Sequence, residues 1–362
     1  MSSETTSTVT ANLGHGTRTA LVVHSTGAPR SAMPSLALGI NVEFGIAASG
    51  ITKLGARIGA SSYSEAGAAN ANTALPTPSQ LTLTPASYVC TVAPTTEAFH
   101  RTDPALVDLS DLLIDELSYP LETLLAYDSS IGLVKYWPPL ASNRVGTSGA
   151  ALTPTTLFNA YLQLQTQIGQ TDIDAICWLD AKGHNDLLLY GLTTAASVFT
   201  APVGYNQMFA DLLVAQGYDI AQYVTSIGRL HLFKEPKPGA LGTASSDTIA
   251  PMFIPGVGGL NGRALPPGVV ARYAELAASL PGGFSIAPAY AIGWRKDPAL
   301  TQVMLGNAGN QFDREIMTPA GVPISIVARG RNGQNLAIID GFTSVVSIEL
   351  NDNSVVGVRY AT

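Results

Sequence analysis

The feature that most constrains this chain is an abrupt change of character between residues 61–86 and residues 104–127. Residues 61–86 consist mainly of small residues, include Pro76 and Pro78, and carry a single charged side chain, Glu65. Because small residues cannot form a core of their own and proline interrupts a β-ladder, this stretch predicts an extended loop. A loop of this length in a compact domain is usually functional or packs on another chain.

Regular structure is expected to begin just after this loop, at Asp103 and Pro104. These two residues suit the N-cap and the first position of a helix. Leucines then recur on one helical face over residues 104–127, and Pro120 inside the pattern lacks the backbone donor that the helix needs. The sequence therefore predicts one long helix with a kink. Its opposite face carries a solvent-facing or partner-facing row of carboxylates, Asp108, Asp111 and Asp115.

The remainder of the chain mixes helices and strands without a regular alternation, which indicates an α+β fold. Thr153-Pro154 and Gly169 predict a helix that is capped at both ends. Residues 234–268 are rich in Gly and Pro and are expected to form a long irregular excursion. Further elements are expected as helices at about 181–196, 205–216 and 269–280, and as strands at 175–179, 228–233, 323–328, 336–339, 345–350 and 355–360.

The charge content is low, and the deficit is concentrated. Charged residues make up 12% of the chain and the net charge is −7, whereas a soluble protein typically has about 25% charged residues. The hydrophobic fraction of 46% excludes intrinsic disorder, and the negative charge excludes nucleic-acid binding by bulk charge. Residues 145–171 contain no charged side chain. We expect residues 61–86 and 145–171 to be covered by other chains.

The sequence predicts no catalytic, cofactor-binding or metal-ligating residue, and no cofactor. The five histidines are not spaced with other ligands as a metal site requires, and Gly-x-Ser-x-Gly and P-loop motifs do not occur. Cys90 and Cys177 are expected to be unpaired, buried thiols. If the chain carries unrecognised chemistry, the site is expected around Asp172, Asp174 and His184.

No membrane segment or secretory signal is expected. The longest apolar runs, such as residues 188–192, fall far short of the roughly 20 residues that a membrane-spanning helix needs. The N-terminal stretch MSSETTSTVTANLG contains Glu4 and no apolar segment.

The order of these parts resembles that of the major capsid proteins of tailed bacteriophages, whose Hong Kong 97-like fold is shared by encapsulins. The stretch LTLTPASYVCTVAPTTEAFHRTDPALVDLSDLLIDELSYPLETLLA looks like the returning strand of an extended loop (E-loop) that runs into the spine helix of the peripheral (P) domain. The stretch TPTTLFNAYLQLQTQIGQTDIDAICWLDAKGHNDLLLYGL resembles the start of the axial (A) domain. The final stretches ISIVARGRNGQNLAIIDG and VGVRYAT look like closing strands.

This resemblance implies a division of the chain into the parts of a capsid subunit. The implied parts are an N-terminal arm at 1–57, the E-loop at 58–89, a P domain at 90–135 with the spine helix at 104–127 and further strands from about 284–335, an A domain at 136–283 with the Gly/Pro-rich insertion 234–268, and closing strands at 336–362.

The resemblance also implies a function. The chain is expected to be a structural protein and not an enzyme, and to self-assemble as hexamers and pentamers into an icosahedral virion shell. The shell would be built in the host cytoplasm and would enclose double-stranded DNA without sequence-specific binding. Scaffolding, portal and decoration proteins would be separate chains. Two alternatives stay open, an encapsulin-like protein compartment and an α+β enzyme.

Overall fold

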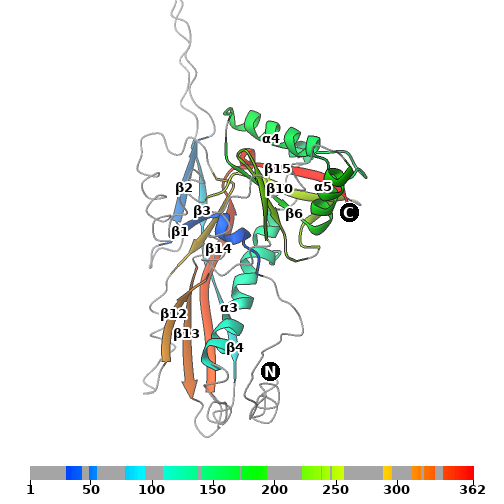
Figure 1. Ribbon diagram of the computed structural model, residues 1–362. Coiled ribbons are helices and arrows are strands. Elements are labelled where there is room, and N and C mark those ends of the chain that lie inside the picture. The colour runs from blue at the N-terminus through cyan, green and yellow to red at the C-terminus, as the bar shows by residue number, and fades with distance from the viewer. Residues whose placement is uncertain are drawn as a thin grey trace, which may run out of the picture.

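The computed structural model describes most of the chain from Arg30 onward. The described residues are 30–42, 49–54, 78–93, 109–136, 141–171, 173–193, 222–237, 239–244, 247–256, 288–295, 312–318, 322–330 and 337–362. Within these ranges the chain forms two large sheets, a two-stranded ribbon and three α-helices (Figure 1). This arrangement confirms the predicted α+β class.

The first sheet has six strands and is built around one long strand, β14 (Ala337–Glu349). The first half of β14 pairs with β13 and β4, and its last residues pair with β11. The other strands of this sheet are β1 (Leu38–Asn41), β4 (Ala86–Val92), β11 (Tyr290–Trp294), β12 (Phe312–Met317) and β13 (Pro323–Gly330).

Helix α3 (Leu109–Tyr127) lies along the six-stranded sheet (Figure 1). It ends where the leucine pattern predicts, and it continues through Pro120. Leu117 and Leu121 of α3 are buried against β13, so the predicted apolar stripe does face the protein interior. The predicted helix start and the carboxylate row lie outside the described residues or have side chains that are not described.

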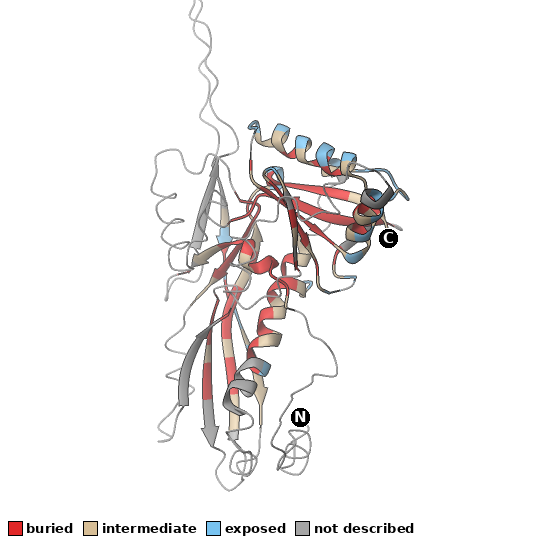
Figure 2. Ribbon diagram, viewed as in Figure 1, coloured by how far each residue is buried: buried red, intermediate tan, exposed pale blue. Residues whose placement is uncertain are grey.

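The second sheet has seven strands in the order β5-β15-β10-β6-β8-β7, and β9 pairs with β10. Its strands are β5 (Arg144–Val145), β6 (Ala175–Leu179), β7 (Tyr223–Ile227), β8 (Leu230–Lys234), β9 (Gly242–Ala244), β10 (Asp247–Phe253) and β15 (Val355–Ala361). All residues of β6 and β10 are buried, so the centre of this sheet is covered on both faces (Figure 2).

Two helices cover part of the seven-stranded sheet. Helix α4 (Pro154–Ile168) has the predicted caps, because the Thr153 side chain accepts a hydrogen bond from the Thr156 amide and Gly169 takes the left-handed conformation with φ 71°. Helix α5 (Ala181–Thr193) begins at the predicted residue. The predicted helices at 205–216 and 269–280 lie outside the described residues.

The expectation of an irregular excursion at 234–268 is wrong for residues 242–244 and 247–253. Strands β9 and β10 fall in this range, and β10 is a central strand of the seven-stranded sheet. Pro251 argued against such a strand, because proline cannot donate to a ladder. However, β9 pairs with β10 only up to Ile249 and β6 pairs only from Met252, so Pro251 lies where β10 has β15 alone as its neighbour.

The strands near the C-terminus divide between the two sheets. β14 belongs to the six-stranded sheet and β15 to the seven-stranded sheet. The predicted strand at 228–233 is β8, which follows β7 through a turn at Gly228, where φ is 61°. Strands β2 (Ser49–Leu54) and β3 (Pro78–Leu83) pair as an antiparallel ribbon, and β3 is followed at once by β4.

One hydrophobic cluster runs through both sheets. It contains Trp178 and Phe253 from the seven-stranded sheet, Tyr290 and Val345 from the six-stranded sheet, and Leu125 from α3. The Phe253 and Tyr290 rings lie 5.2 Å apart across this boundary. The two sheets therefore share this cluster, and of the two sheets only the six-stranded one contributes to two smaller clusters.

Candidate functional site

The structure does not assemble the hypothetical enzyme site. Asp174 forms a two-pronged ion pair with Arg229, at 3.0 and 2.8 Å, and Nε2 of His231 lies 3.7 Å from its carboxylate. No hydrogen bond or ion pair joins Asp174 to His184, although both residues are described. Burial and the neighbouring charge of Lys234 lower the pKa of His184. Asp172 lies outside the described residues.

Asp174 has the environment of a structural carboxylate. Partial burial alone would raise its pKa, but the nearby His231 and the hydrogen bonds and charge of Arg229 lower the pKa to about 2. The carboxylate is therefore held ionised by its neighbours, which does not suit a general base near neutral pH.

Other sites for chemistry are also lacking in the part of the chain that the structure describes. No group of three or more His, Cys, Asp or Glu residues there could hold a metal ion. Cys90 and Cys177 are both free, and Cys177 is fully buried, which raises the pKa of its thiol. None of the described helices is both long enough and apolar enough to cross a membrane.

A buried carboxylate, Asp247, lies at the start of the central strand β10 and joins that strand to the loop that follows β5. Its Oδ1 accepts the Gly149 amide at 2.8 Å, and its Oδ2 accepts the Ser148 hydroxyl at 2.7 Å. The Arg359 guanidinium of β15 contacts Oδ2 at 2.6 Å. The hydrogen bonds from Ser148 and Gly149, with Arg359, lower the pKa of Asp247. These partners all belong to one sheet and its adjoining loop.

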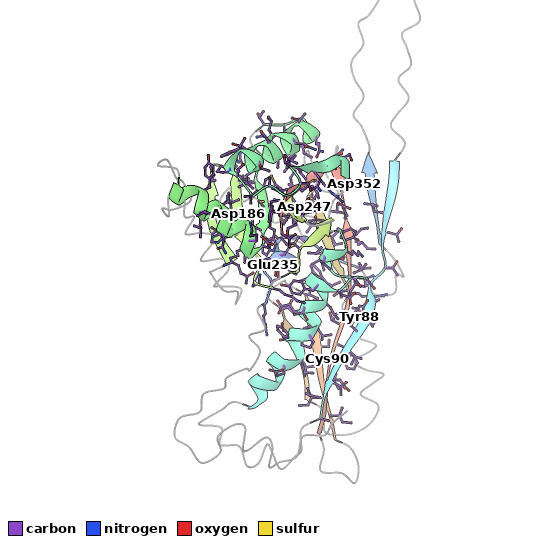
Figure 3. All side chains as sticks on the ribbon, turned by 90° about the vertical axis from the view of Figure 1, so that its right-hand side faces the viewer. Tyr88, Cys90, Asp186, Glu235, Asp247 and Asp352 are labelled. Carbon is purple, nitrogen blue, oxygen red and sulfur yellow. The ribbon has the colours of Figure 1, made fainter. Side chains whose placement is uncertain are left out.

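A second buried carboxylate, Glu235, joins three separate parts of the fold (Figure 3). Its Oε2 accepts the Trp178 indole N–H from β6 at 2.6 Å and the Ser31 hydroxyl at 3.2 Å. Its Oε1 accepts the Lys237 amide at 2.9 Å and the Tyr127 hydroxyl from the end of α3. Burial, together with the adjacent Glu235 charge, raises the pKa of Tyr127, so this phenol remains a donor.

Sequence reasoning missed both carboxylate clusters. Three of the four partners of Glu235 lie 57, 108 and 204 residues away along the chain. Neither spacing nor periodicity indicates such a group, and no short motif marks it.

The outer face of α4 exposes large apolar side chains. Phe158 is 44% exposed and Leu162 is 61% exposed, one helical turn apart, while Leu157 and Leu164 are buried beneath. On α5, Leu189 is 61% exposed. Figure 2 shows that one side of α4 is exposed. Since residues 145–171 lack charge, this side is uncharged, and Phe158 and Leu162 lie on it beside polar residues such as Asn159. Large apolar side chains that are exposed together are typical of an interaction site.

Comparison with known proteins finds the fold but no close relative. No protein-family profile matches the sequence, and no curated protein matches it. Among solved structures, the chain is similar to one from the capsid of a native GTA particle, with 9% identity and a TM-score of 0.54. That match covers 96% of this chain and 94% of the other. This chain has the Hong Kong 97-like capsid fold.

Two further matches agree. A chain of the capsid of an empty GTA particle has 11% identity and a TM-score of 0.52, and the match covers 98% of each chain. A chain of the capsid of the cyanophage P-SCSP1u has 11% identity and a TM-score of 0.50, covering 96% of this chain and 93% of the other. All three matched chains come from capsids.

Proposed function

We propose that this chain is a major capsid protein, many copies of which self-assemble into an icosahedral virion shell around double-stranded DNA. The observation that carries the proposal is the extent of the structural match. Capsid chains superpose on 96–98% of this sequence, and 93–98% of those chains is covered in return. Such end-to-end correspondence leaves little of the chain to form an additional catalytic domain.

The surface of α4 supports assembly. Phe158 and Leu162 are exposed on an uncharged helix face, and burying apolar area against a neighbour is the main favourable term in association. We propose that this face contacts a neighbouring subunit in the shell. This deepens the expectation that residues 145–171 are covered by other chains.

The parts of a capsid subunit can be assigned to the observed elements. We propose that the β2–β3 ribbon is the base of the E-loop, that α3 is the spine helix of the P domain, and that the seven-stranded sheet belongs to the A domain. The six-stranded sheet would complete the P domain. Portal, scaffolding and decoration proteins would be separate partners, and assembly would take place in the host cytoplasm.

Electron microscopy of the purified full-length protein tests the proposal. Closed shells of uniform diameter are expected under assembly conditions. A chain that stays monomeric under all such conditions would contradict the proposal. If an activity were found instead, its loss in Asp174→Ala with unchanged oligomeric state would favour the enzyme alternative.

The contents of particles from the native source distinguish a virion from a protein compartment. A virion shell is expected to protect double-stranded DNA from added nuclease. Particles that contain a discrete protein cargo and no nuclease-resistant DNA would favour the encapsulin-like alternative while leaving the shell function intact.

A further inference from the structure

The segment from Arg30 to Asn41 lies across the boundary between the two sheets. It begins beside α3, forms a short 3-10 turn at Met33–Leu36, and ends as β1, which pairs in parallel with β11 of the six-stranded sheet. Ser31, Ala32, Met33 and Leu36 are all buried. We call residues 30–41 the strap.

One end of the strap is attached to α3. The Arg30 guanidinium forms an ion pair with Glu122 at 3.2 Å and lies 3.4 Å from the Ser118 hydroxyl. Glu122 is only 2% exposed, so the pair is shielded from solvent on the carboxylate side. Opposite charges in such a setting attract more strongly than at an exposed surface.

The strap is also attached to the seven-stranded sheet through its backbone. The Ala32 amide donates to Gln222 at 2.8 Å, and the Gln222 side chain donates back to the Arg30 carbonyl at 2.7 Å. Farther along, the Gly256 amide donates to the Leu36 carbonyl at 2.8 Å. Gly256 tolerates no side chain there, because an added Cβ would lie 2.1 Å from the Leu38 nitrogen.

Glu235 is the point at which the strap, α3 and the seven-stranded sheet meet. Its two oxygens divide the donors into pairs: Oε2 takes Ser31 and Trp178, whereas Oε1 takes Tyr127 and the Lys237 amide. An ionised carboxylate can accept at both oxygens. A glutamine cannot, because either orientation of its amide turns an N–H₂ group toward one pair of donors.

We propose that the strap fixes the two sheets relative to each other and that the Glu235 carboxylate holds the strap in place. Loss of this carboxylate releases the strap and the end of α3 together, without unfolding either sheet. A conformational change in the segment around Arg30 is thus transmitted through the strap to the contact between the two sheets. This inference concerns the single chain and stands independently of the capsid proposal.

Hydrogen–deuterium exchange of the full-length protein tests this proposal. The variants are Glu235→Gln, Ser31→Ala and the control Asp247→Asn, all compared with wild type in the same oligomeric state by sedimentation. Glu235→Gln is expected to raise exchange about tenfold or more in both residues 30–36 and residues 121–127, because hydrogen bonds to a charged group are among the stronger ones. Asp247→Asn is expected to raise exchange only near 146–150 and 355–361.

Two results would overturn the proposal. One is increased exchange in Glu235→Gln that is confined to residues 230–237 and β6, with the strap and α3 unchanged. The other covers the case in which Glu235→Gln fails to fold. Ser31→Ala removes the strap's donor to the carboxylate and also the acceptor of the Met33 amide, so Met33 is left out of the comparison. Unchanged exchange over the other residues of 30–36 in that variant would show that Glu235 does not hold the strap. Increased exchange there supports the proposal.

Discussion

Glu235 and Asp247 are buried carboxylates of the same sheet, yet they are satisfied in different ways. Asp247 meets a guanidinium, a hydroxyl and an amide that all belong to the seven-stranded sheet and its adjoining loop. Glu235 accepts from four neutral donors that come from the sheet, the strap and α3. The first carboxylate joins two strands of one sheet to the adjoining loop, whereas the second joins parts of the fold that have no backbone ladder in common.

The largest expected effect follows from removing the carboxylate at the joint. Glu235→Ala leaves the Trp178 and Tyr127 donors buried without their acceptor, so the free energy of unfolding is expected to fall by about 3–5 kcal/mol. Chemical denaturation of the unassembled chain, followed by circular dichroism, measures this loss. A loss that leaves cooperativity unchanged and stays below about 1 kcal/mol would contradict the assigned role.

The Asp247 site can be disturbed without changing the carboxylate itself. Gly146 has φ 124°, and an added Cβ would lie 2.2 Å from the Arg359 carbonyl. Gly146→Ala is therefore expected to destabilise the protein by about 1–3 kcal/mol and to displace the loop that reaches Asp247. Gly169→Ala is the matched control, because Gly169 also has positive φ (71°) but has open space around it. Equal losses at both positions would show that the close approach at Gly146 is unimportant.

A third carboxylate, Asp174, is paired with the charged Arg229, whereas Glu235 accepts from neutral donors. The contribution of Asp174 to stability is therefore expected to depend on pH. Its pKa is about 2 in the folded chain, below the ordinary value of 3.8. The ionised carboxylate therefore stabilises the fold by about 2 kcal/mol above about pH 5, and this contribution is lost as the pH falls toward 2.

The measurement is the difference in unfolding free energy between wild type and Asp174→Asn across this range. The difference is expected to shrink as the pH falls from 5 to 2. A difference that stays constant over that interval would show that the Arg229 pair does not stabilise the ionised form.

The smallest effect on stability is expected on the exposed outer face of α4. Phe158→Ser and Leu162→Ser should change the free energy of unfolding by only about 0.5 kcal/mol, because both side chains are exposed. Assembly, measured by light scattering and sedimentation, is expected to be slowed or lost. Asn159→Ser, an exposed polar position on the same helix, is the control and should assemble normally.

The contrast between local and long-range contacts also explains how much the sequence could predict. Helix α4 was predicted from Thr153, Pro154 and Gly169, and the structure confirms each of these local signals. The apolar stripe of α3 was likewise predicted, because Leu117, Leu121 and Leu125 repeat at helical spacing. The resemblance to capsid proteins, drawn from the order of such elements, is confirmed as a fold.

Features that depend on long-range pairing were not predicted. Strand β10 was hidden by Pro251 and by its Gly- and Pro-rich flanks, and only the gap between β9 and β6 makes this proline acceptable. The division of β14 and β15 between two sheets, and the convergence of Ser31 and Tyr127 on Glu235, depend on contacts that no local pattern encodes.

The most direct test of the central claim is a cryo-electron microscopy reconstruction of particles formed by the purified wild-type chain. The account predicts a closed icosahedral shell in which each subunit contains both sheets as described and the Phe158–Leu162 face of α4 is covered by a neighbouring copy. A monodisperse monomer, or a shell in which this face is open to solvent on every subunit, would contradict it.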